Sequence, residues 1–193
     1  MLIPLGHVAR VSTGFPFRRK VESEPGGDLV LIQIKDINAT EGVFPTGAVM
    51  LRSDQRNYDR YLLQAGDLLF QSRGSRHPAT MVGDGLRGIA ASGLHVVRPK
   101  AQRVLPEYLA WWLNHPQVQE RLSREFAHGT HIPFVSKTDL EGLSVPVPSL
   151  EVQRRIVDAW RLQRETETLN TRLNELLKRL TDAVTLDAAR KED

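Results

Sequence analysis

The stretch LSVPVPSLEVQRRIVDAWRLQRETETLNTRLNELLKRL (143–180) decides the organisation of this chain. It opens on a short apolar run in which Pro148 cannot continue a strand ladder, because proline has no amide hydrogen to donate. Ser149 follows, and its hydroxyl can accept a hydrogen bond from a free amide of a first helical turn. The stretch therefore predicts that a folded domain ends at 148 and that a long helix begins at 149.

Small or apolar side chains recur along this helix at alternating steps of three and four residues. They are Ala159, Leu162, Thr166, Leu169, Leu173, Leu176, Leu180 and Ala183. A repeat of 3.5 residues is typical of a coiled-coil seam, which needs a partner helix. Because an unpaired seam would leave a long apolar ridge in water, we expect a homodimer held by its leucines. These are Leu162, Leu169, Leu173, Leu176 and Leu180.

The 193 residues have room for one domain of ordinary size, 1–148, and one appendage, 149–193. A helix of about 40 residues is roughly 60 Å long and cannot bury its own apolar stripe. The appendage holds nine basic and nine acidic residues, so the net charge of +3 belongs to the domain before it. This mild excess permits nucleic-acid binding without requiring it.

Composition also narrows the class of protein. The chain has no cysteine, which excludes disulfides and thiolate metal sites. No apolar run approaches the roughly 18 residues of a membrane span, and the first residues do not have the pattern of a signal peptide. We therefore expect a cytoplasmic protein with no membrane partner.

The first domain combines strand patterns with later helix patterns, which predicts an α+β fold. Apolar and β-branched residues favour strands at 29–37, 43–51, 67–72 and 88–99, separated by glycine, proline, aspartate and asparagine. Helix is expected from Pro106, a residue suited to a first helical position. Pro116 interrupts that helix, and a second helix follows. The adjacent tryptophans of the first helix are expected in the core rather than on a binding surface.

The sequence motifs of common enzymes are missing. No Glu-x-Lys, Walker, His-Glu-x-x-His or Gly-x-Ser-x-Gly sequence occurs. A literal Gly-x-Gly-x-x-Gly does occur at 83–88, but a strand pattern follows it, whereas a nucleotide-binding turn opens a helix. We therefore expect a plain loop at 83–88, and we expect no catalytic residue and no cofactor in the chain.

The segment AHGTHIP (127–133) places His128 and His131 three residues apart. Two imidazoles without a further nearby ligand make a poor metal site, so we expect no metal. A surface loop is one interpretation. The other is a loop that faces DNA, since both imidazoles and the Thr130 hydroxyl can form hydrogen bonds to phosphate or to base edges.

Two further segments concentrate basic residues in expected loops. The first contains Arg18, Arg19 and Lys20 after STGFPF (12–17); the second leaves a strand at SRGSRHP (72–78). Guanidinium groups can bind guanine or phosphate oxygens, and glycine permits a close approach to DNA. Solvated surface loops remain the alternative. If the loops face DNA, the contacting residues are expected to be Arg18, Arg19, Lys20, Arg73, Ser75, Arg76, His77, His128, Thr130, His131 and Lys137.

Taken in order, these segments resemble the specificity subunit of a type I restriction–modification system. IPLGHVARVSTGFPF (3–17) resembles the opening of the family's target recognition domain, and LVLIQIKDI (29–37) resembles its first strand. The Gly-Asp strand LLQAGDLLFQSRG (62–74) and the helical stretch 105–130 follow. HIPFVSKTDLEGLSVPVPSLEVQRRIV (131–157) is similar to the run of proline, leucine and glutamine that opens the family's long helix. Their order and spacing carry the resemblance.

The resemblance implies a non-catalytic head that reads double-stranded DNA and an arm that sets spacing and docks methyltransferase subunits. A restriction subunit is a further partner in such systems. Family members of full length carry two heads and two antiparallel arms, whereas this sequence has one of each and resembles a half-length subunit. Two identical heads would then read a bipartite site as a homodimer. The family's base-reading residues vary, so no single contact transfers.

Two functions in other classes stay open at this point. The chain could be an adaptor whose coiled coil joins partners while its head binds protein rather than DNA. It could also be an enzyme acting on nucleic acid alone, although the missing motifs argue against this. Binding that weakens steeply with salt would favour DNA.

Overall fold

The structure is a computed structural model, and it describes residues 1–17, 21–38, 42–43, 45, 47–54, 57–126 and 133–190. The chain divides into two compact units, Met1–Arg154 and Arg155–Asp193. The first unit is an α+β domain of mixed sheets and helices, and the last helix runs from it through the second unit. The expected fold class is therefore confirmed.

The first unit contains most of the elements. In chain order they are β1 (Leu2–Pro4), α1 (Leu5–Val8), β2 (Ala9–Thr13), β3 (Leu29–Ile32), η1 (Ile34–Asp36), β4 (Ile37–Asn38), β5 (Gly42–Val43), β6 (Val49–Leu51), η2 (Asp59–Tyr61), β7 (Leu68–Gln71), β8 (Ala79–Met81), β9 (Gly88–Ala90), β10 (Leu94–Pro99), α2 (Pro106–Asn114), α3 (Pro116–Arg121), the π-helix η3 (Leu122–Phe126), α4 (Lys137–Gly142) and β11 (Ser144–Pro146). The helix α5 (Leu150–Arg190) begins in this unit and continues as the second.

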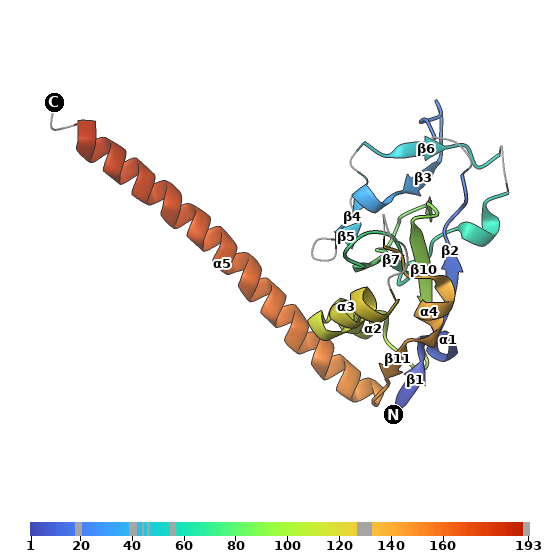
Figure 1. Ribbon diagram of the computed structural model, residues 1–193. Coiled ribbons are helices and arrows are strands. Elements are labelled where there is room, and N and C mark those ends of the chain that lie inside the picture. The colour runs from blue at the N-terminus through green and yellow to red at the C-terminus, as the bar shows by residue number, and fades with distance from the viewer. Residues whose placement is uncertain are drawn as a thin grey trace. The chain divides into compact units, whose positions relative to one another are not determined.

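The central sheet has four antiparallel strands in the order β2-β10-β7-β8. A smaller sheet, β6-β3-β9, lies toward one end of the domain, and the pair β1-β11 lies at the other (Figure 1). The β1-β11 pair joins residues 2–4 to residues 144–146, so the two ends of the domain's sequence are hydrogen-bonded to each other. The Tyr108 hydroxyl donates to the carbonyl of Pro146 at 2.7 Å and ties this pair to α2.

The expected strand at 88–99 is wrong in one respect, because it is two strands in two sheets. Leu94 donates its amide to the carbonyl of Ala91 at 2.9 Å, which closes a turn between β9 and β10. Before the turn, β9 pairs in parallel with β3; after it, β10 lies antiparallel between β2 and β7. This segment therefore joins the two sheets.

The expected strands at 29–37 and 43–51 are also shorter than predicted. After Ile32 the Asp36 carboxylate accepts the amide of Gln33 at 2.9 Å, and this local bond competes with the ladder and produces η1. Gly47 has a positive φ of 68°, which breaks the second segment between β5 and β6. Alternating apolar residues alone did not reveal either interruption.

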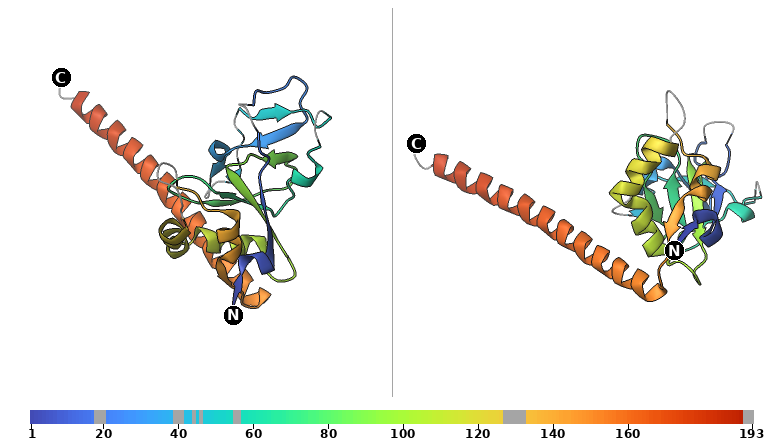
Figure 2. Two further views of the ribbon diagram at one scale, coloured as in Figure 1. Left: turned by 45° about the vertical axis from the view of Figure 1, so that its right-hand side comes forward. Right: turned by 60° about the horizontal axis from the view of Figure 1, so that its bottom comes forward.

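The helices α2 and α3 start at prolines, as the sequence predicts, and lie beside the strands of the domain (Figure 2). Trp112 is buried, which confirms its expected place in the core. Trp111 is only partly buried and contacts the rings of Tyr108 and His115. Residues 82–87 form a loop and Gly88 begins β9, so a strand follows these glycines, whereas a nucleotide-binding turn opens a helix.

Two apolar clusters stabilise the sheets. Ile32, Leu69, Val82, Leu94 and Val96 belong to the cluster beneath the central sheet. A second cluster, built around Leu29, Leu31, Leu51 and Ile89, holds the smaller sheet. A fully buried aliphatic side chain contributes about 1.5–3 kcal/mol to the free energy of unfolding.

Two glycines are required by geometry. A Cβ on Gly14 would lie 2.1 Å from the carbonyl oxygen of Ala91, because the chain leaving β2 runs against the end of β9. Gly66 has a φ of 84° in the turn before β7. The next residue, Asp67, is buried, accepts the amide of Gln64 at 2.8 Å, and binds the Arg98 guanidinium through both carboxylate oxygens at 2.6 and 2.7 Å. Gly66 thus forms the turn before β7, and Asp67 forms an ion pair with Arg98.

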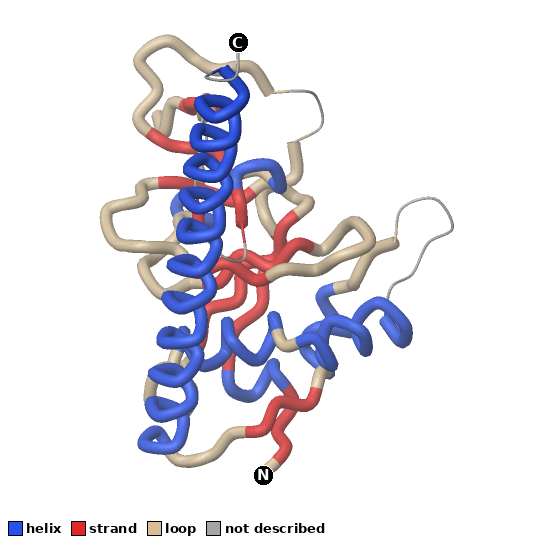
Figure 3. The backbone as a smooth tube through the Cα atoms, turned by 90° about the vertical axis from the view of Figure 1, so that its left-hand side faces the viewer, coloured by secondary structure: helices blue, strands red, loops and turns tan. Residues whose placement is uncertain are grey.

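The helix α5 has 41 residues and is unbroken from Leu150 to Arg190 (Figure 3). The Ser149 hydroxyl accepts the amide of Val152 at 3.4 Å, in agreement with the predicted cap. In the first turn, the fully buried Gln153 accepts the amide of Leu105 at 2.9 Å and donates to the carbonyls of Arg103 and Pro148 at 3.0 and 2.9 Å. Gln153 therefore joins the start of α5 to the loop before α2.

Candidate nucleic-acid interface

The segments 72–74 and 133–135 are far apart in the sequence and are paired in the structure. Val135 donates its amide to the carbonyl of Ser72 at 2.8 Å, and Gly74 donates to the carbonyl of Pro133 at 2.9 Å. Arg73 and Phe134 face each other across this bridge. Two segments that the sequence indicated separately as DNA-facing thus meet at the end of β7; we call residues 72–76 with 133–137 the basic loop pair.

The basic loop pair exposes several of the predicted residues. Arg73, Ser75 and Arg76 are exposed, and within the described residues neither arginine has an ion pair. Gly74 has a φ of 116°, and the Gln71 side chain donates from its Nε2 to the carbonyl of Arg73 at 2.7 Å, so the turn has a defined shape. Unpaired guanidinium groups on an ordered turn suit phosphate oxygens or guanine edges.

Phe134 was not predicted and is the apolar member of this surface. Its side chain is 41% exposed beside Arg73. Its neighbour Val135 is fully buried, so the strand-like alternation turns Phe134 outward. An exposed aromatic ring beside arginines can stack on a base or contact a thymine methyl group.

Lys137 is exposed at the start of α4, and its ammonium lies 3.4 Å from the Glu141 carboxylate. The Ser136 hydroxyl accepts the amide of Asp139 at 3.1 Å and caps this helix. An exposed i,i+4 pair contributes only about 0.3–0.5 kcal/mol, so a phosphate can compete for the lysine. Lys137 lies two residues after Val135, whose amide donates to the carbonyl of Ser72.

The structure corrects the expectation for His77, whose side chain is fully buried. Its ring is parallel to that of Phe70, with the centroids 5.9 Å apart, and its Nδ1 donates to the carbonyl of Gln71 at 3.0 Å. The imidazole therefore packs in the interior of the domain, beneath the loop that carries Arg73 and Arg76, and cannot contact DNA. No sequence pattern indicates this burial, because the residue stands in a polar, glycine-containing run.

Two amide side chains hold the edge of β8 and the loop before it. Gln119 of α3 accepts the His77 amide at 3.1 Å and donates to the His77 carbonyl at 2.8 Å. Asn114, at the end of α2, accepts the Ala79 amide at 3.0 Å and donates to the Ala79 carbonyl at 2.7 Å. Because the bonded residues are two apart, the amides replace the missing neighbour of an edge strand. They position the loop that carries Arg73 and Arg76.

His95 supports the other half of the basic loop pair. Its Nε2 donates to the carbonyl of Val135 at 3.0 Å, and its ring is parallel to Phe70 with the centroids 6.4 Å apart. Gln119, Asn114 and His95 were not predicted as part of the site. Each lies in a helix or strand pattern, and only the structure shows that its polar atoms bond to distant backbone.

Burial disfavours the protonated form of both buried histidines. Each uses one ring nitrogen as a donor to a carbonyl, while His77 Nε2 and His95 Nδ1 are buried without a partner among the described residues. Burial lowers the pKa of both below the ordinary value of 6.5; nearby Lys137 lowers the pKa of His95 further, and Glu141 opposes this. A second proton would place an unpaired charge in the core.

We expect the domain to lose stability as the pH falls from 7.5 to 5.5. The unfolded chain binds protons at its histidines below about pH 6.5, whereas the native state resists them, so the free energy of unfolding decreases on acidification. The limiting slope is about 1.4 kcal/mol per pH unit for each imidazole. Urea unfolding at a series of pH values measures it.

Two substitutions keep a hydrogen-bond donor at each position and remove the imidazole that can be protonated. His77→Asn places an amide near Nδ1, and His95→Gln places one near Nε2. The double variant should show a flatter pH dependence between 7.5 and 5.5, while His7→Gln, at a position outside the core, should match the wild type. An unchanged slope in the double variant would show that other groups cause the pH dependence.

Six of the predicted contact residues lie outside the described residues. They are Arg18, Arg19, Lys20, His128, Thr130 and His131. The chain before Arg18 is anchored, because Phe15 packs against Phe17, Tyr58 and Tyr61 with ring centroids 4.7–5.0 Å apart. The segment 127–132 is flanked by η3 and by the paired residues 133–135.

The described part of the chain contains no group of three or more histidine, cysteine, aspartate or glutamate side chains that could hold a metal. Among the same residues, none of the helices has the length and hydropathy needed to cross a membrane.

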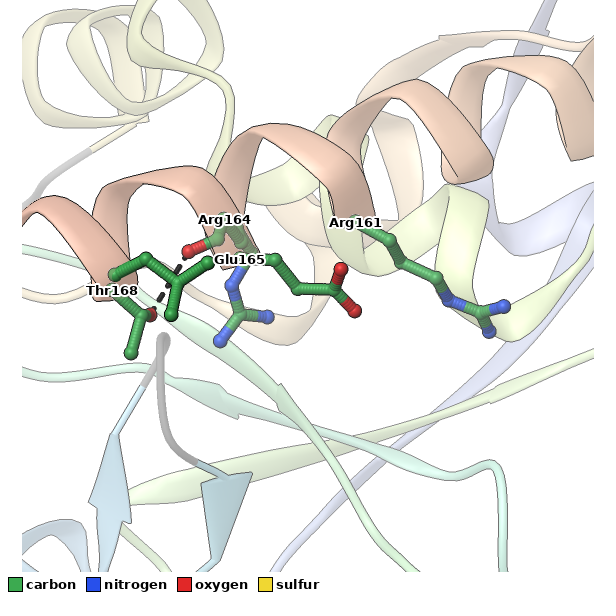
Figure 4. Close-up of a pocket in the computed structure, with 5 residues that line it drawn as sticks. Arg161, Arg164, Glu165 and Thr168 are labelled. Atoms are coloured by element: carbon green, nitrogen blue, oxygen red, sulfur yellow. Dashed lines mark hydrogen bonds between the residues drawn. The ribbon is translucent and has the colours of Figure 1, made fainter.

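In the described part of α5, the leucines of the predicted coiled-coil seam are exposed to solvent. The exposed fractions are 66% for Leu162, 67% for Leu169, 53% for Leu173 and Leu176, and 61% for Leu180. The polar residues between them form local bonds: Thr168 donates to the carbonyl of Arg164 at 2.9 Å, as Figure 4 shows. Thr166, a seam position, likewise donates to the carbonyl of Leu162 at 2.8 Å. Its hydroxyl can therefore enter an apolar interface without losing its hydrogen bond.

Comparison with known proteins identifies the family. The model of the type I restriction modification DNA specificity domain matches residues 1–179. The chain belongs to this family. No match was found among curated proteins.

Three solved structures share the fold. One, described as the structural basis of complex assembly and conformational transition of the type I R-M system, has a TM-score of 0.67 and 22% identity over 88% of this chain and 39% of its own. The HsdS subunit from Thermoanaerobacter tengcongensis has a TM-score of 0.65 and 24% identity over 90% and 44%. The type I S subunit from M. genitalium has a TM-score of 0.56 and 13% identity over 86% and 39%. This chain thus spans less than half the length of each.

Proposed function

We propose that the chain is a non-catalytic, sequence-specific DNA-recognition subunit. The observation that carries this proposal is the basic loop pair, in which a main-chain bridge brings exposed, unpaired arginines beside Phe134 and Lys137. Membership in a family of DNA specificity domains supports it. The head, 1–148, reads DNA, and the helix after it, 149–193, provides association and spacing. It is proposed to act in the cytoplasm.

The helix is proposed to pair with that of a second copy. Its exposed leucines follow the 3.5-residue repeat, and Thr166 has its hydroxyl satisfied within its own helix. The nine basic and nine acidic residues of this segment leave no net charge to oppose self-association. Two-fold symmetry then requires inverted half-sites in the DNA.

The DNA-bound dimer would recruit catalytic subunits. We propose a methyltransferase subunit as the partner and, where one is present, a restriction subunit. If the helices are antiparallel, as the family resemblance implies, they form a rod of roughly 60 Å. The half-sites would be separated by a spacer of about one turn of DNA or less.

The proposal predicts DNA binding that weakens steeply with salt. Alanine at a residue that contacts phosphate should weaken binding to every sequence and lower the salt slope by about one. Alanine at a residue that reads a base should cost roughly 1–3 kcal/mol on the cognate site only. The variants are Arg18→Ala, Arg19→Ala, Arg73→Ala, Arg76→Ala and Lys137→Ala, with fluorescence anisotropy at several salt concentrations as the measurement.

Arg87→Ala is the matched control, since Arg87 is exposed and pairs with Asp28 away from the basic loop pair. If the variant with all five residues replaced binds DNA with unchanged affinity, these residues do not form the DNA-binding surface. An adaptor whose head binds protein predicts no salt-dependent DNA binding by the wild type. Methyl transfer or strand cleavage by the pure chain would support an enzyme instead.

A further inference from the structure

A small basic hollow lies on β2, at the edge of the central sheet opposite β8. Arg10, Ser12, Arg60, Tyr61 and Arg98 are among the residues that line it. Its cavity volume is ≈ 30 Å³. One water molecule needs about 10–15 Å³ of such space, so the hollow admits an oxygen-sized group and excludes a nucleotide or a drug-sized ligand.

Two of the three arginines face each other directly. In the register of β2 and β10, Arg10 is the partner of Arg98. Like charges in this position destabilise a sheet. Arg98 is neutralised by the buried Asp67, with bonds of 2.6 and 2.7 Å, and its Nη2 also donates to the carbonyl of Leu62 at 3.1 Å. Among the described residues, Arg10 has no such carboxylate.

The third arginine is held in place by an aromatic ring. The Arg60 guanidinium lies 4.9 Å from the centroid of Tyr61, and its Nη2 donates to the Tyr61 hydroxyl at 3.0 Å. Tyr61 packs against Phe15, which makes this support rigid. Arg60 also has no ion pair within the described part of the chain. The hollow therefore keeps the positive charge of Arg10 and Arg60 beside the hydroxyl of Ser12.

We propose that this hollow binds a non-bridging phosphate oxygen of the DNA backbone, at a second contact separate from the basic loop pair. The small volume selects one oxygen of an anion whose remaining atoms stay outside. The two uncompensated guanidinium groups, Arg10 and Arg60, select a negative charge, and a bound anion neutralises them. The site reads no base and gives affinity for every sequence. This inference deepens the proposed function and depends on it.

The test compares Arg10→Gln and Arg60→Gln with Arg103→Gln, an exposed arginine of the same domain outside the hollow. Binding of a DNA duplex of arbitrary sequence is measured from 50 to 200 mM salt. Each hollow variant should lower the slope of log affinity against log salt by about one. The control should lower it less. Arg10→Gln should also leave the melting temperature nearly unchanged, because Arg10 is exposed and has no ion pair among the described residues.

Three other outcomes would overturn the inference. If the wild type binds DNA but the hollow variants have the same salt slope as Arg103→Gln, the hollow does not bind a phosphate. The proposed function would be unaffected by that result. If the wild type shows no salt-dependent DNA binding, the proposed function is wrong. In that case inorganic phosphate is titrated into the protein, and the arginine Nε–H signals are followed by NMR. Shifts confined to the hollow would show a free-anion site instead of a DNA contact, and no shifts would show no anion site.

Discussion

Replacing Leu169, Leu173 and Leu176 together with glutamate should convert the protein from a dimer to a monomer. These side chains are 53–67% exposed in the described chain and occupy successive seam positions. Burial of an exposed leucine contributes about 1.5 kcal/mol or more, so the six substituted side chains of a dimer remove several kcal/mol of favourable burial and place six charges in the seam. Glutamate also favours helix, so the secondary structure should survive. Sedimentation at micromolar concentration measures the mass.

A matched control separates charge from loss of the seam. Thr168→Glu, Thr171→Glu and Asn174→Glu add the same three charges at exposed positions off the seam. This control should remain dimeric, with unchanged circular dichroism. The seam variant should also bind only half-sites, and weakly. A wild type that sediments as a monomer, or a seam variant that stays dimeric, would contradict the proposed association.

Replacing Gln153 with alanine should cause a large loss of stability in the first unit. The fully buried amide satisfies one amide and two carbonyls, on Leu105, Arg103 and Pro148. Each buried polar group left without a partner costs about 1–3 kcal/mol. The free energy of unfolding should therefore fall by roughly 3 kcal/mol or more. Urea unfolding at neutral pH measures the change.

Two companion variants identify the cause. Gln153→Glu keeps the shape but replaces the donor to two carbonyls with a carboxylate oxygen, so it should destabilise at least as much as alanine. Arg154→Ala, at the exposed next position, should change stability by less than about 0.5 kcal/mol. Equal stability of Gln153→Glu and the wild type would show that the two hydrogen bonds donated by Gln153 are not important.

The sequence predicted the features that depend on local chemistry. The cap at Ser149 and the length of α5 follow from a hydroxyl before a heptad pattern, and the helix starts follow from Pro106 and Pro116. The strand at 29–37 was overestimated because the Asp36 carboxylate bonds back to Gln33. The separation of β9 from β10 could not be predicted, since parallel pairing with β3 is a long-range choice.

The candidate site was only partly predictable for the same reason. Composition identified Arg73 and Arg76 as exposed loop residues, and the structure agrees. It could not show that the 133–135 segment pairs with this loop, or that His77 turns inward onto Phe70. Gln119 bonds to a residue 42 positions away, which no sequence period encodes. The parts of a site that hold loops in place are the least visible in a sequence.

Selection of bound duplexes from a randomised DNA pool tests the central claim most directly. The purified full chain is mixed with the pool at about 50 mM salt, where electrostatic contacts are strong, and the bound duplexes are sequenced through several rounds. A symmetric dimer of DNA-reading heads predicts enrichment of one inverted repeat with a fixed spacer. The seam variant should enrich the single half-site. A pool with no enriched sequence, or an asymmetric site selected by the homodimer, would contradict the account.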